Sequence, residues 1–253
     1  MRVQKIIKKN NYYILSLSNG DKIKTYEEVI IKNNLLYKKV INDKLLKKIK
    51  DDNAYYKVYN NVLGLINKRF RSEHEVRQYL NKNEINADTQ SEIINKLKDL
   101  NLINDNNYAI MYVNDRINLS LDGPYKIKRH LILNNIDSDV IEKVIESIPN
   151  TVIDNHINKI LEKKTKSSTK YSEKAYKQKL LLYLKNMGYP VERVKYLIEN
   201  ITINRNDKEF EKAYNTLSKK YSGNELKTNF ILKMLTKGHK REEINDFLSE
   251  NSM

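Results

Sequence analysis

The 253-residue chain contains no cysteine and no tryptophan, and it has only three prolines and six glycines. Without cysteine it can form neither a disulfide bond nor a thiolate metal site, so we expect a protein of the reducing cytoplasm. No apolar run approaches the roughly twenty residues that span a bilayer. The N-terminal stretch also lacks an apolar segment long enough for the hydrophobic region of a signal peptide. We therefore expect no membrane partner.

Catalytic motifs are equally scarce. The six glycines never fall in a Gly-x-Gly or Gly-x-x-x-x-Gly-Lys arrangement, so the sequence predicts no nucleotide-binding loop. The four histidines lie far apart, and none has the partner three or four positions away that would indicate a helical metal site. With no Ser/His/Asp signature either, we expect no catalytic residues, no metal, no cofactor and no enzymatic activity.

Apolar residues, by contrast, recur about every fifty positions. Four amphipathic helices each have an apolar residue near their end, which we call the anchor: Leu80, Leu131, Leu184 and Leu235. Four positions before the anchors stand Val76, Ile127, Leu180 and Ile231. Thirteen positions after the anchors stand Ile93, Val144, Leu197 and Leu248. In each repeat an earlier helix also carries apolar residues. These are Val58 and Val62 in repeat 1, Ala109 and Val113 in repeat 2, Ile153, Ile157 and Ile160 in repeat 3, and Ala213 and Leu217 in repeat 4. Because three short helices cannot bury their apolar faces alone, the pattern predicts a mainly α fold, an elongated array of tandem three-helix repeats.

The first quarter of the chain reads differently. Short β-branched and aromatic segments predict a small three-stranded β-meander, with Asn19-Gly20 as a two-residue type I′ turn. Thr25 and Glu28 predict a capping box that begins a helix, and a second, separate helix is expected over residues 43–50. The predicted domains are an N-terminal meander and helix extension (1–52) and repeats 1 to 4 (53–102, 103–148, 149–203 and 204–253).

Helix starts recur in the repeats as well. Ser72 with Glu75 forms a capping box, and Gly123-Pro124 places a proline at a first-turn position, where its missing N–H costs little. Ser172 and Ser222 are expected to begin the corresponding helices of repeats 3 and 4. Measured from these starts to the anchors, the second helix of the last two repeats is predicted to be about one turn longer.

Positive charge is concentrated at the two ends. The formal net charge is +15, with balances of +7 for residues 1–52, zero for residues 53–148 and +8 for residues 149–253. A charge of this size predicts a polyanionic partner or an acidic protein surface, although a basic composition that serves only solubility is the plain alternative. The layout suggests basic flanks that grip phosphate and a balanced centre that contacts protein.

Three sequence patterns resemble those of the RecX family of recombination regulators. An Arg-Ser before an acidic helix is followed by a Leu-rich junction and then by Arg and Gly-Pro before a basic helix. These patterns comprise Arg71, Ser72, Glu75, Val76, Arg77 and Leu80, then Leu97, Leu100, Ile103, Asp105, Tyr108 and Ala109, and then Arg116, Gly123, Pro124, Ile127 and Leu131. The resemblance is most specific over residues 60–148, and the N-terminal extension and fourth repeat resemble the longer members of low-GC Gram-positive bacteria.

The resemblance implies a monomeric protein that binds the RecA filament and single- and double-stranded DNA without sequence preference. It implies that the protein modulates, chiefly by inhibition, recombinase, ATPase and coprotease activity, and that it has a role in DNA repair, homologous recombination and the SOS response. Candidate contact residues for RecA or DNA are Arg69, Arg71, Arg77, Arg116, Lys126, Lys128, Arg129, Lys163, Lys164, Lys166, Lys170, Lys219 and Lys220. For each of them alone, solvation of a helix face is the competing interpretation.

A different class of function remains open on the sequence alone. Tandem three-helix units can present a recognition helix to the major groove, which would make the chain a stand-alone duplex-DNA-binding protein. That alternative predicts a preference for particular DNA sequences, whereas filament binding predicts strong salt dependence and little preference.

Overall fold

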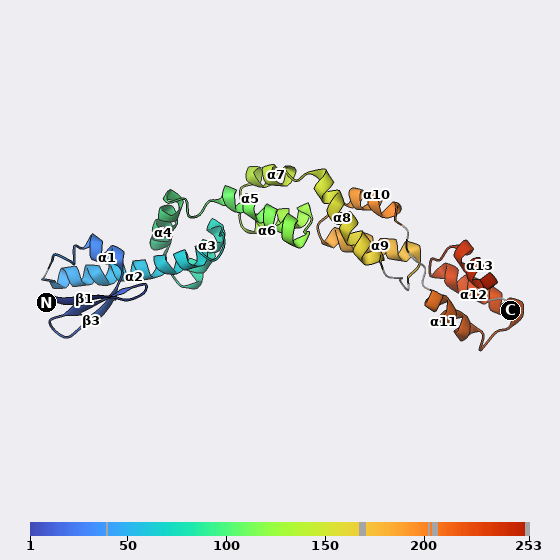
Figure 1. The fold of residues 1–253 in the computed structure, drawn as a ribbon, viewed down its shortest axis with the longest axis horizontal. Helices are drawn as coiled ribbons and strands as arrows, with labels where there is room; N and C mark the ends of the chain where they lie inside the picture. Colours follow the sequence, from blue (N-terminus) through green and yellow to red (C-terminus); the bar gives the residue numbers. More distant parts are fainter. Residues whose placement is uncertain (39, 167–170, 202, 204–206, 251–253) are drawn as a thin grey trace. The chain divides into compact units, whose positions relative to one another are not determined.

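The computed structural model describes residues 1–38, 40–166, 171–201, 203 and 207–250. The chain divides into two compact units, Met1–Tyr108 and Ala109–Met253, which we describe one at a time. The described residues form helices α1 to α13, a π-helical turn and a three-stranded antiparallel sheet in the order β1-β2-β3 (Figure 1). The predicted fold class, mainly α with helical repeats and a small N-terminal β-meander, is confirmed.

The meander consists of β1 (Val3–Lys8), β2 (Tyr13–Leu17) and β3 (Lys22–Thr25). Leu15 and Leu17 alternate inward on β2 and are fully buried, as the period of two requires. The turn between β2 and β3 differs from the predicted type I′, because Gly20 has a positive φ of 89° and Asn19 does not. The amide of Gly20 donates to the carbonyl of Leu17, so the hairpin closes through a three-residue loop whose last residue is left-handed.

The first helix starts later than the sequence predicted. Helix α1 (Glu27–Lys32) begins after Tyr26 and has no side-chain cap. Thr25 is paired with Tyr13 in the sheet, so its backbone is held in a strand and cannot also form a helix cap. Its hydroxyl is buried and has no hydrogen-bond partner within the described part of the chain. The predicted capping box of Thr25 and Glu28 is therefore wrong.

Helix α2 (Asp43–Ile66) serves both the extension and repeat 1. It begins with the Asn42 side chain accepting from the amide of Leu45 and runs for 24 residues. Ile49, near its start, is buried in the core of the extension, whereas Tyr59 and Val62 are buried in the core of repeat 1. The helix expected over residues 43–50 is present, but it is not separate: it continues into the first helix of repeat 1, because no glycine or proline interrupts it before residue 64. The predicted domain boundaries remain a proposal.

Repeat 1 is completed by α3 (Glu73–Lys82) and α4 (Ala87–Asp99). The predicted capping box is present: the Ser72 hydroxyl accepts from the Glu75 amide at 3.1 Å, and the Glu75 carboxylate accepts from the Ser72 amide at 3.3 Å. Val76 and Leu80 of α3 pack against Ile93 of α4 in one buried cluster. The predicted inward stripe of repeat 1 is thus confirmed for its second and third helices.

The remaining three repeats follow the same order of helices. Their elements are α5 (Asp105–Asp115), the π-helical turn η1 (Arg116–Ser120), α6 (Pro124–Leu133) and α7 (Ser138–Glu146); α8 (Asn150–Thr165), α9 (Glu173–Asn186) and α10 (Val191–Glu199); and α11 (Asp207–Leu217), α12 (Gly223–Thr236) and α13 (Arg241–Glu250). The second helices α3 and α6 have 10 residues and α9 and α12 have 14, which confirms the extra turn in the last two repeats.

The register of repeat 4 differs by one residue from the prediction. Met234 is fully buried, whereas the predicted anchor Leu235 is 39% exposed, and Phe230 takes the place expected for Ile231. In every repeat the backbone amide of the residue five positions after the anchor donates a hydrogen bond to the anchor's carbonyl, and this bond caps the C-terminal end of the helix. The donors are Ile85, Ile136, Tyr189 and His239, and their acceptors are Leu80, Leu131, Leu184 and Met234.

Within the second compact unit, one repeat meets the next through the same pair of features. The amide of Gly123, at the start of α6, donates to the carbonyl of Met187 at the end of α9, at 2.8 Å. The Ser172 hydroxyl, at the start of α9, donates to the carbonyl of Lys237 at the end of α12, at 3.0 Å. The start of one repeat's second helix therefore docks on the loop that follows the second helix of the next repeat.

Candidate functional site

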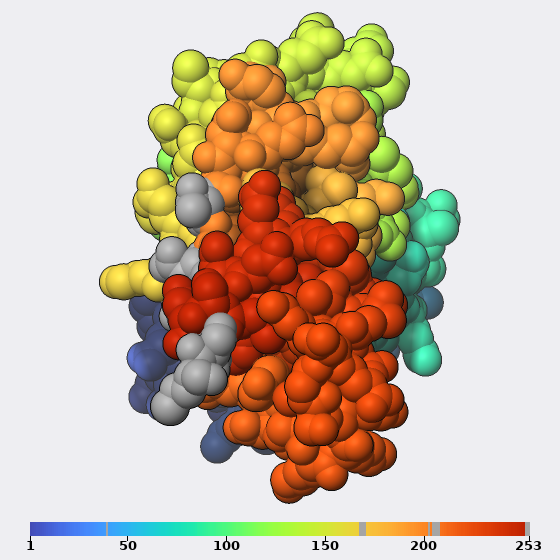
Figure 2. All heavy atoms as spheres, turned by 90° about the vertical axis from the view of Figure 1, so that its right-hand side faces the viewer, coloured from blue at the N-terminus to red at the C-terminus, as the bar shows by residue number. Residues whose placement is uncertain are grey.

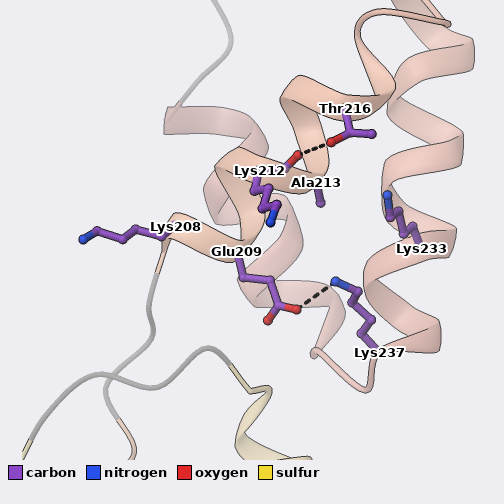
Figure 3. A pocket seen from close by; sticks show the side chains of 7 residues that line it. All are labelled: Lys208, Glu209, Lys212, Ala213, Thr216, Lys233 and Lys237. Atoms are coloured by element: carbon purple, nitrogen blue, oxygen red, sulfur yellow. Dashed lines mark hydrogen bonds and ion pairs between the residues drawn. The ribbon is translucent and has the colours of Figure 1, made fainter.

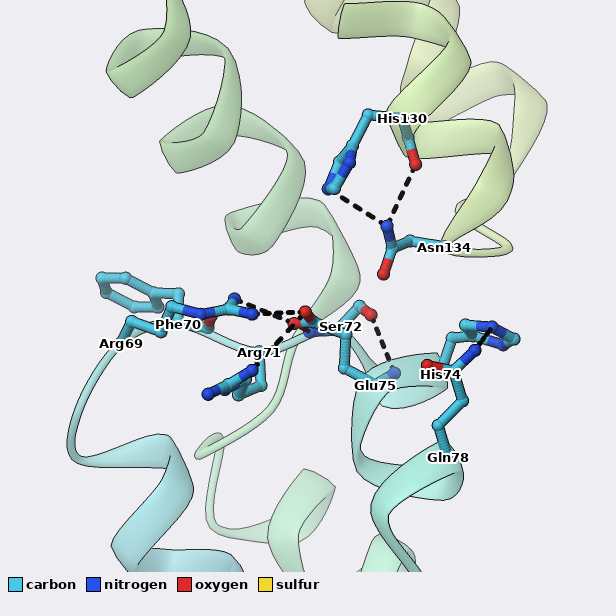
Figure 4. Close-up of polar contacts among 9 residues, drawn as sticks. All are labelled: Arg69, Phe70, Arg71, Ser72, His74, Glu75, Gln78, His130 and Asn134. Atoms are coloured by element: carbon cyan, nitrogen blue, oxygen red, sulfur yellow. Dashed lines mark hydrogen bonds and ion pairs between the residues drawn. The ribbon is translucent and has the colours of Figure 1, made fainter. Parts of the chain in front are cut away.

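Arg69 and Glu75 form a two-pronged ion pair beside the start of α3 (Figure 4). The two guanidinium nitrogens of Arg69 lie 3.0 and 2.5 Å from the two carboxylate oxygens of Glu75. Burial is the largest single effect and raises the pKa of Glu75, but the hydrogen bonds and charge of Arg69, the Ser72 amide and the charge of Arg71 together hold the pKa below its ordinary value. The half-exposed side chain of Arg69 is thus held in one orientation by a single carboxylate.

Arg71 shares the same carboxylate less closely. Its guanidinium lies 3.6 Å from Glu75 and is only 23% exposed, and its Nε is buried without a hydrogen-bond partner in the described residues. A buried donor of this kind costs free energy unless a partner satisfies it. Among Arg69, Arg71 and Arg77, the side chain of Arg71 is the least exposed to solvent.

Arg77 belongs to a second network of ion pairs, centred on Glu73, which lies one helical turn before Arg77 on α3. The carboxylate of Glu73 accepts from Arg77 at 2.7 Å and also pairs with Lys98 of α4. Burial is the largest single effect and opposes ionisation of Glu73, but the hydrogen bonds and positive charges of Lys98 and Arg77 together lower its pKa. The backbone amide of Glu73 donates to Asp105, whose pKa is raised by burial. The sequence analysis did not select Lys98, although this residue lies between two residues of the family pattern, Leu97 and Leu100.

In repeat 2, aromatic and basic side chains stack between α5 and α6. The rings of Tyr112 and His130 lie parallel, with centroids 4.0 Å apart. The guanidinium of Arg116 lies 5.0 Å from the centre of the Tyr112 ring, a cation–π distance. His130 also contacts the side-chain amide of Asn134 at 3.1 Å (Figure 4). The sequence predicted Arg116 as a contact residue but gave no sign of the Tyr112 ring beneath it.

The other basic residues of repeat 2 lie on α6. Lys126 pairs with Asp122 at 2.7 Å, one turn earlier, and its side chain remains 55% exposed. Arg129 is exposed and Lys128 is half-buried. These three side chains and Arg116 belong to the second compact unit, and Arg69, Arg71 and Arg77 belong to the first.

The predicted basic residues of repeats 3 and 4 are exposed at helix ends. Lys163 and Lys164 lie in the last turn of α8, Lys166 caps it, and Lys219 and Lys220 follow α11. Lys164 lies 4.5 Å above the ring of Tyr183, which restricts it more than its neighbours. Lys170 lies outside the described residues, as do the three residues before it, 167–169.

Repeat 4 holds a group of lysines that sequence reasoning did not select. Lys208, Lys212, Lys233 and Lys237 line a hollow of about 470 Å³ between α11 and α12 (Figure 3). The spacing of four between Lys208 and Lys212, and again between Lys233 and Lys237, puts each pair on one face of its helix. That spacing was visible in the sequence, but that lysines of both helices line one hollow depends on how the helices pack.

His239 also differs from its sequence interpretation. Its buried ring lies 3.3 Å from Glu209 and 3.5 Å from Glu243, so it does have a carboxylate one helical turn away. No group of three or more His, Cys, Asp or Glu side chains that could hold a metal ion occurs among the residues with described positions. Over the same residues, no helix is both long enough and apolar enough to cross a membrane.

Family models match the two repeats that carry these arginine networks. The first three-helix domain of RecX matches residues 59–97, and the second three-helix domain of RecX matches residues 104–145. Both matches lie in the segment in which the sequence patterns are most specific.

Full-length relatives extend the match to the whole chain. The chain is 32% identical to the regulatory protein RecX of Streptococcus agalactiae serotype III (strain NEM316), over 99% of both chains. It is 29% identical to the regulatory protein RecX of Streptococcus pneumoniae serotype 19F (strain G54), again over 99% of both. A crystal structure of regulatory protein RecX shares the fold, with a TM-score of 0.59 at 22% identity over 79% of this chain and 99% of that one. The chain therefore belongs to the RecX family of regulatory proteins.

Proposed function

We propose that this protein binds the nucleoprotein filament of the RecA recombinase, together with its DNA, and inhibits the filament's ATPase, strand-exchange and coprotease activities. The observation that carries the proposal is the match to regulatory RecX proteins along 99% of the chain. Because the match includes the N-terminal extension and repeat 4, the relation concerns the whole array and not one module.

The distribution of charge supports a division of labour within this function. The centre, residues 53–148, is neutral overall, and several of its arginines are oriented by carboxylates, as Arg69 is by Glu75. Fixed arginines favour recognition of a defined protein surface, because little side-chain entropy is lost on binding. The ends carry balances of +7 and +8, which favour contacts to phosphate.

Tandem repeats also suit a filament. Each three-helix repeat offers a small surface, and small surfaces bind weakly when they act singly. A partner that itself repeats along an axis lets several weak contacts act together, so that the effective concentration of each later contact rises. The protein would then act at a lower molar ratio than any one contact would allow.

The test adds the purified full-length protein to RecA assembled on single-stranded DNA, and follows ATP hydrolysis together with filament length. We expect slower hydrolysis and shorter filaments below one protein per RecA protomer. Unchanged hydrolysis and length at equal molar amounts would refute the proposal. A strong preference for one duplex sequence in the absence of RecA would instead favour the stand-alone DNA-binding alternative.

A matched pair of variants separates contact from charge. Lys128→Glu with Arg129→Glu changes two basic residues on α6 of repeat 2, and Lys57→Glu with Lys143→Glu changes two exposed lysines by the same total charge. We expect the first pair to weaken inhibition at least tenfold more than the second. Equal losses would mean that net charge, and not this face of α6, contributes to inhibition.

A further inference from the structure

The hollow between α11 and α12 has the dimensions and the lining of a binding groove. Its volume is about 470 Å³, and the residues that surround it come from both helices. They are Lys208, Glu209, Lys212, Ala213, Thr216, Lys233 and Lys237. The small side chain of Ala213 leaves the space between the two lysine ridges open, as Figure 3 shows. Figure 2 shows that the surface of repeat 4, drawn in orange and red, is open to solvent on the face in view.

Positive charge predominates around this groove. The lining contains four lysines and one glutamate, and the carboxylate of Glu209 already lies 2.8 Å from Lys237 and 3.3 Å from the His239 ring. Lys212 and Lys233 form no ion pair with a described residue, and in Figure 3 both extend along the hollow, while Lys208 points away from it. An anion that entered the groove would therefore meet two lysines whose charge is not already balanced.

The corrected register shows that this feature is particular to repeat 4. Counted from the buried anchor of each second helix, the position just before the anchor holds Tyr79, His130, Tyr183 and Lys233 in repeats 1 to 4. In repeat 2 the ring of His130 stacks on Tyr112 of α5. In repeat 3 the ring of Tyr183 lies under Lys164 of α8. Repeat 4 has a lysine at this position, and the aromatic contacts between its first and second helices lie elsewhere, where Phe210 and Tyr214 of α11 meet Phe230 of α12.

The chemistry of the lining favours one class of ligand. Protein partners are anchored by aromatic or large apolar side chains at the centre of an interface, and the seven lining residues include none. Lysines are flexible point charges that suit a row of phosphates without reading the bases. We propose that this groove, called here the lysine groove, binds the phosphate backbone of a nucleic-acid strand. The inference deepens the DNA-binding part of the proposed function and rests on it, but it requires nothing of RecA.

The experiment measures binding of the full-length protein to a labelled single strand of about 20 nucleotides, without RecA, over a series of salt concentrations. The test variant is Lys212→Gln with Lys233→Gln, and the control is Lys57→Gln with Lys82→Gln, two exposed lysines outside the groove. Losing two phosphate contacts should make the slope of log affinity against log salt shallower by about 1.4, which is roughly a 25-fold loss at 0.1 M relative to 1 M salt. The control should keep a slope within about 0.5 of the unaltered protein.

A second variant tests the groove without relying on charge removal alone. Lys233→Tyr installs the residue that repeats 1 and 3 hold at this position, so the fold should accept it. It should weaken binding at least as much as Lys233→Gln, because the ring fills the groove. Thermal unfolding of every variant checks that repeat 4 remains folded.

The possible results separate the lysine groove from the regulatory proposal. Unchanged affinity and slope in the test variant, or equal losses in test and control, would overturn the groove. Loss of RecA inhibition with unchanged DNA binding would also overturn it, since the groove would then contact an acidic protein surface. Weaker DNA binding in the test variant supports the groove even if the unaltered protein leaves RecA activity unaffected, a result that would refute the proposed function alone.

Discussion

Gly123 and Gly188 lie so close together that neither can carry a side chain. A Cβ on Gly123 would stand 2.3 Å from the carbonyl carbon of Gly188, and a Cβ on Gly188 would stand 2.4 Å from the backbone nitrogen of Lys126. Gly188 also has a φ of +89°, a conformation that favours glycine. The contact joins repeat 2 to repeat 3 through the backbone of both, with the amide of Tyr125 donating to Gly188 at 2.9 Å.

Gly123→Ala should therefore destabilise the protein. The added methyl group meets backbone atoms that cannot move independently, and overpacking of this kind costs about 1–3 kcal/mol or more. Chemical denaturation of the full chain measures the loss. Gly64→Ala is the control: nothing lies within 4 Å of its added Cβ, and alanine in a helix should stabilise by about 0.5–1 kcal/mol. Equal stabilities for the two variants would contradict the close contact.

Two serines at equivalent helix starts should respond differently to substitution. The Ser72 hydroxyl accepts from the Glu75 amide, whereas Ser222 begins α12 without a side-chain cap. Ser72→Ala should cost about 1 kcal/mol or more, the usual effect of losing a cap, and Ser222→Ala only a few tenths. Denaturation midpoints of the two variants compare them directly, and a larger loss at Ser222 would be inconsistent with the capping box.

Acid should weaken repeat 1 through its two paired carboxylates. The pKa values of Glu73 and Glu75 are both lowered, because the hydrogen bonds and positive charges around them together exceed the large opposing effect of burial. A lowered pKa contributes stability above the unfolded value of 4.5, and that stability is lost as pH falls from there through the folded pKa. The raised pKa of Asp105 acts in the opposite direction and offsets part of the loss.

The pH dependence can be assigned with Glu75→Gln. This variant should lose less stability than the unaltered protein between about pH 5 and pH 3, because one depressed carboxyl is gone. Urea denaturation at several pH values gives the two curves, and Glu142→Gln on α7 serves as the charge control. Parallel curves for Glu75→Gln and the unaltered protein would show that the Arg69 pair contributes nothing to acid sensitivity.

Reversing the charges of Lys163, Lys164, Lys166 and Lys170 tests the basic end of α8. If these lysines contact phosphate, replacing all four with glutamate should make the salt slope for single-stranded DNA shallower by up to about 2.8. Fluorescence anisotropy across salt concentrations measures it. An unaltered affinity and slope would identify the segment as a solvated helix end.

Short-range patterns in the sequence predict much of this fold. The fifty-residue spacing of apolar residues, the Ser72 capping box and the longer helices α9 and α12 all follow from short-range rules of periodicity and capping, and the sequence predicted them. The same holds for the RecX family patterns around Arg71 and Gly123. Within each helix the apolar periodicity and the cap depend on residues about one turn apart, so the sequence predicts them without knowledge of the tertiary structure.

Tertiary structure decided what local patterns leave open. Met234 and Leu235 are both apolar, and only packing against the other helices shows that the first is buried and the second is not. Thr25 could cap a helix, but pairing with Tyr13 keeps it in a strand. The lysines of α11 and α12 are far apart in sequence, and they line one hollow, together with Ala213, only because the two helices pack against each other. Sequence alone determined the repeats and their family, whereas long-range contacts determined which of their surfaces can bind, since those surfaces are built from residues that meet only after folding.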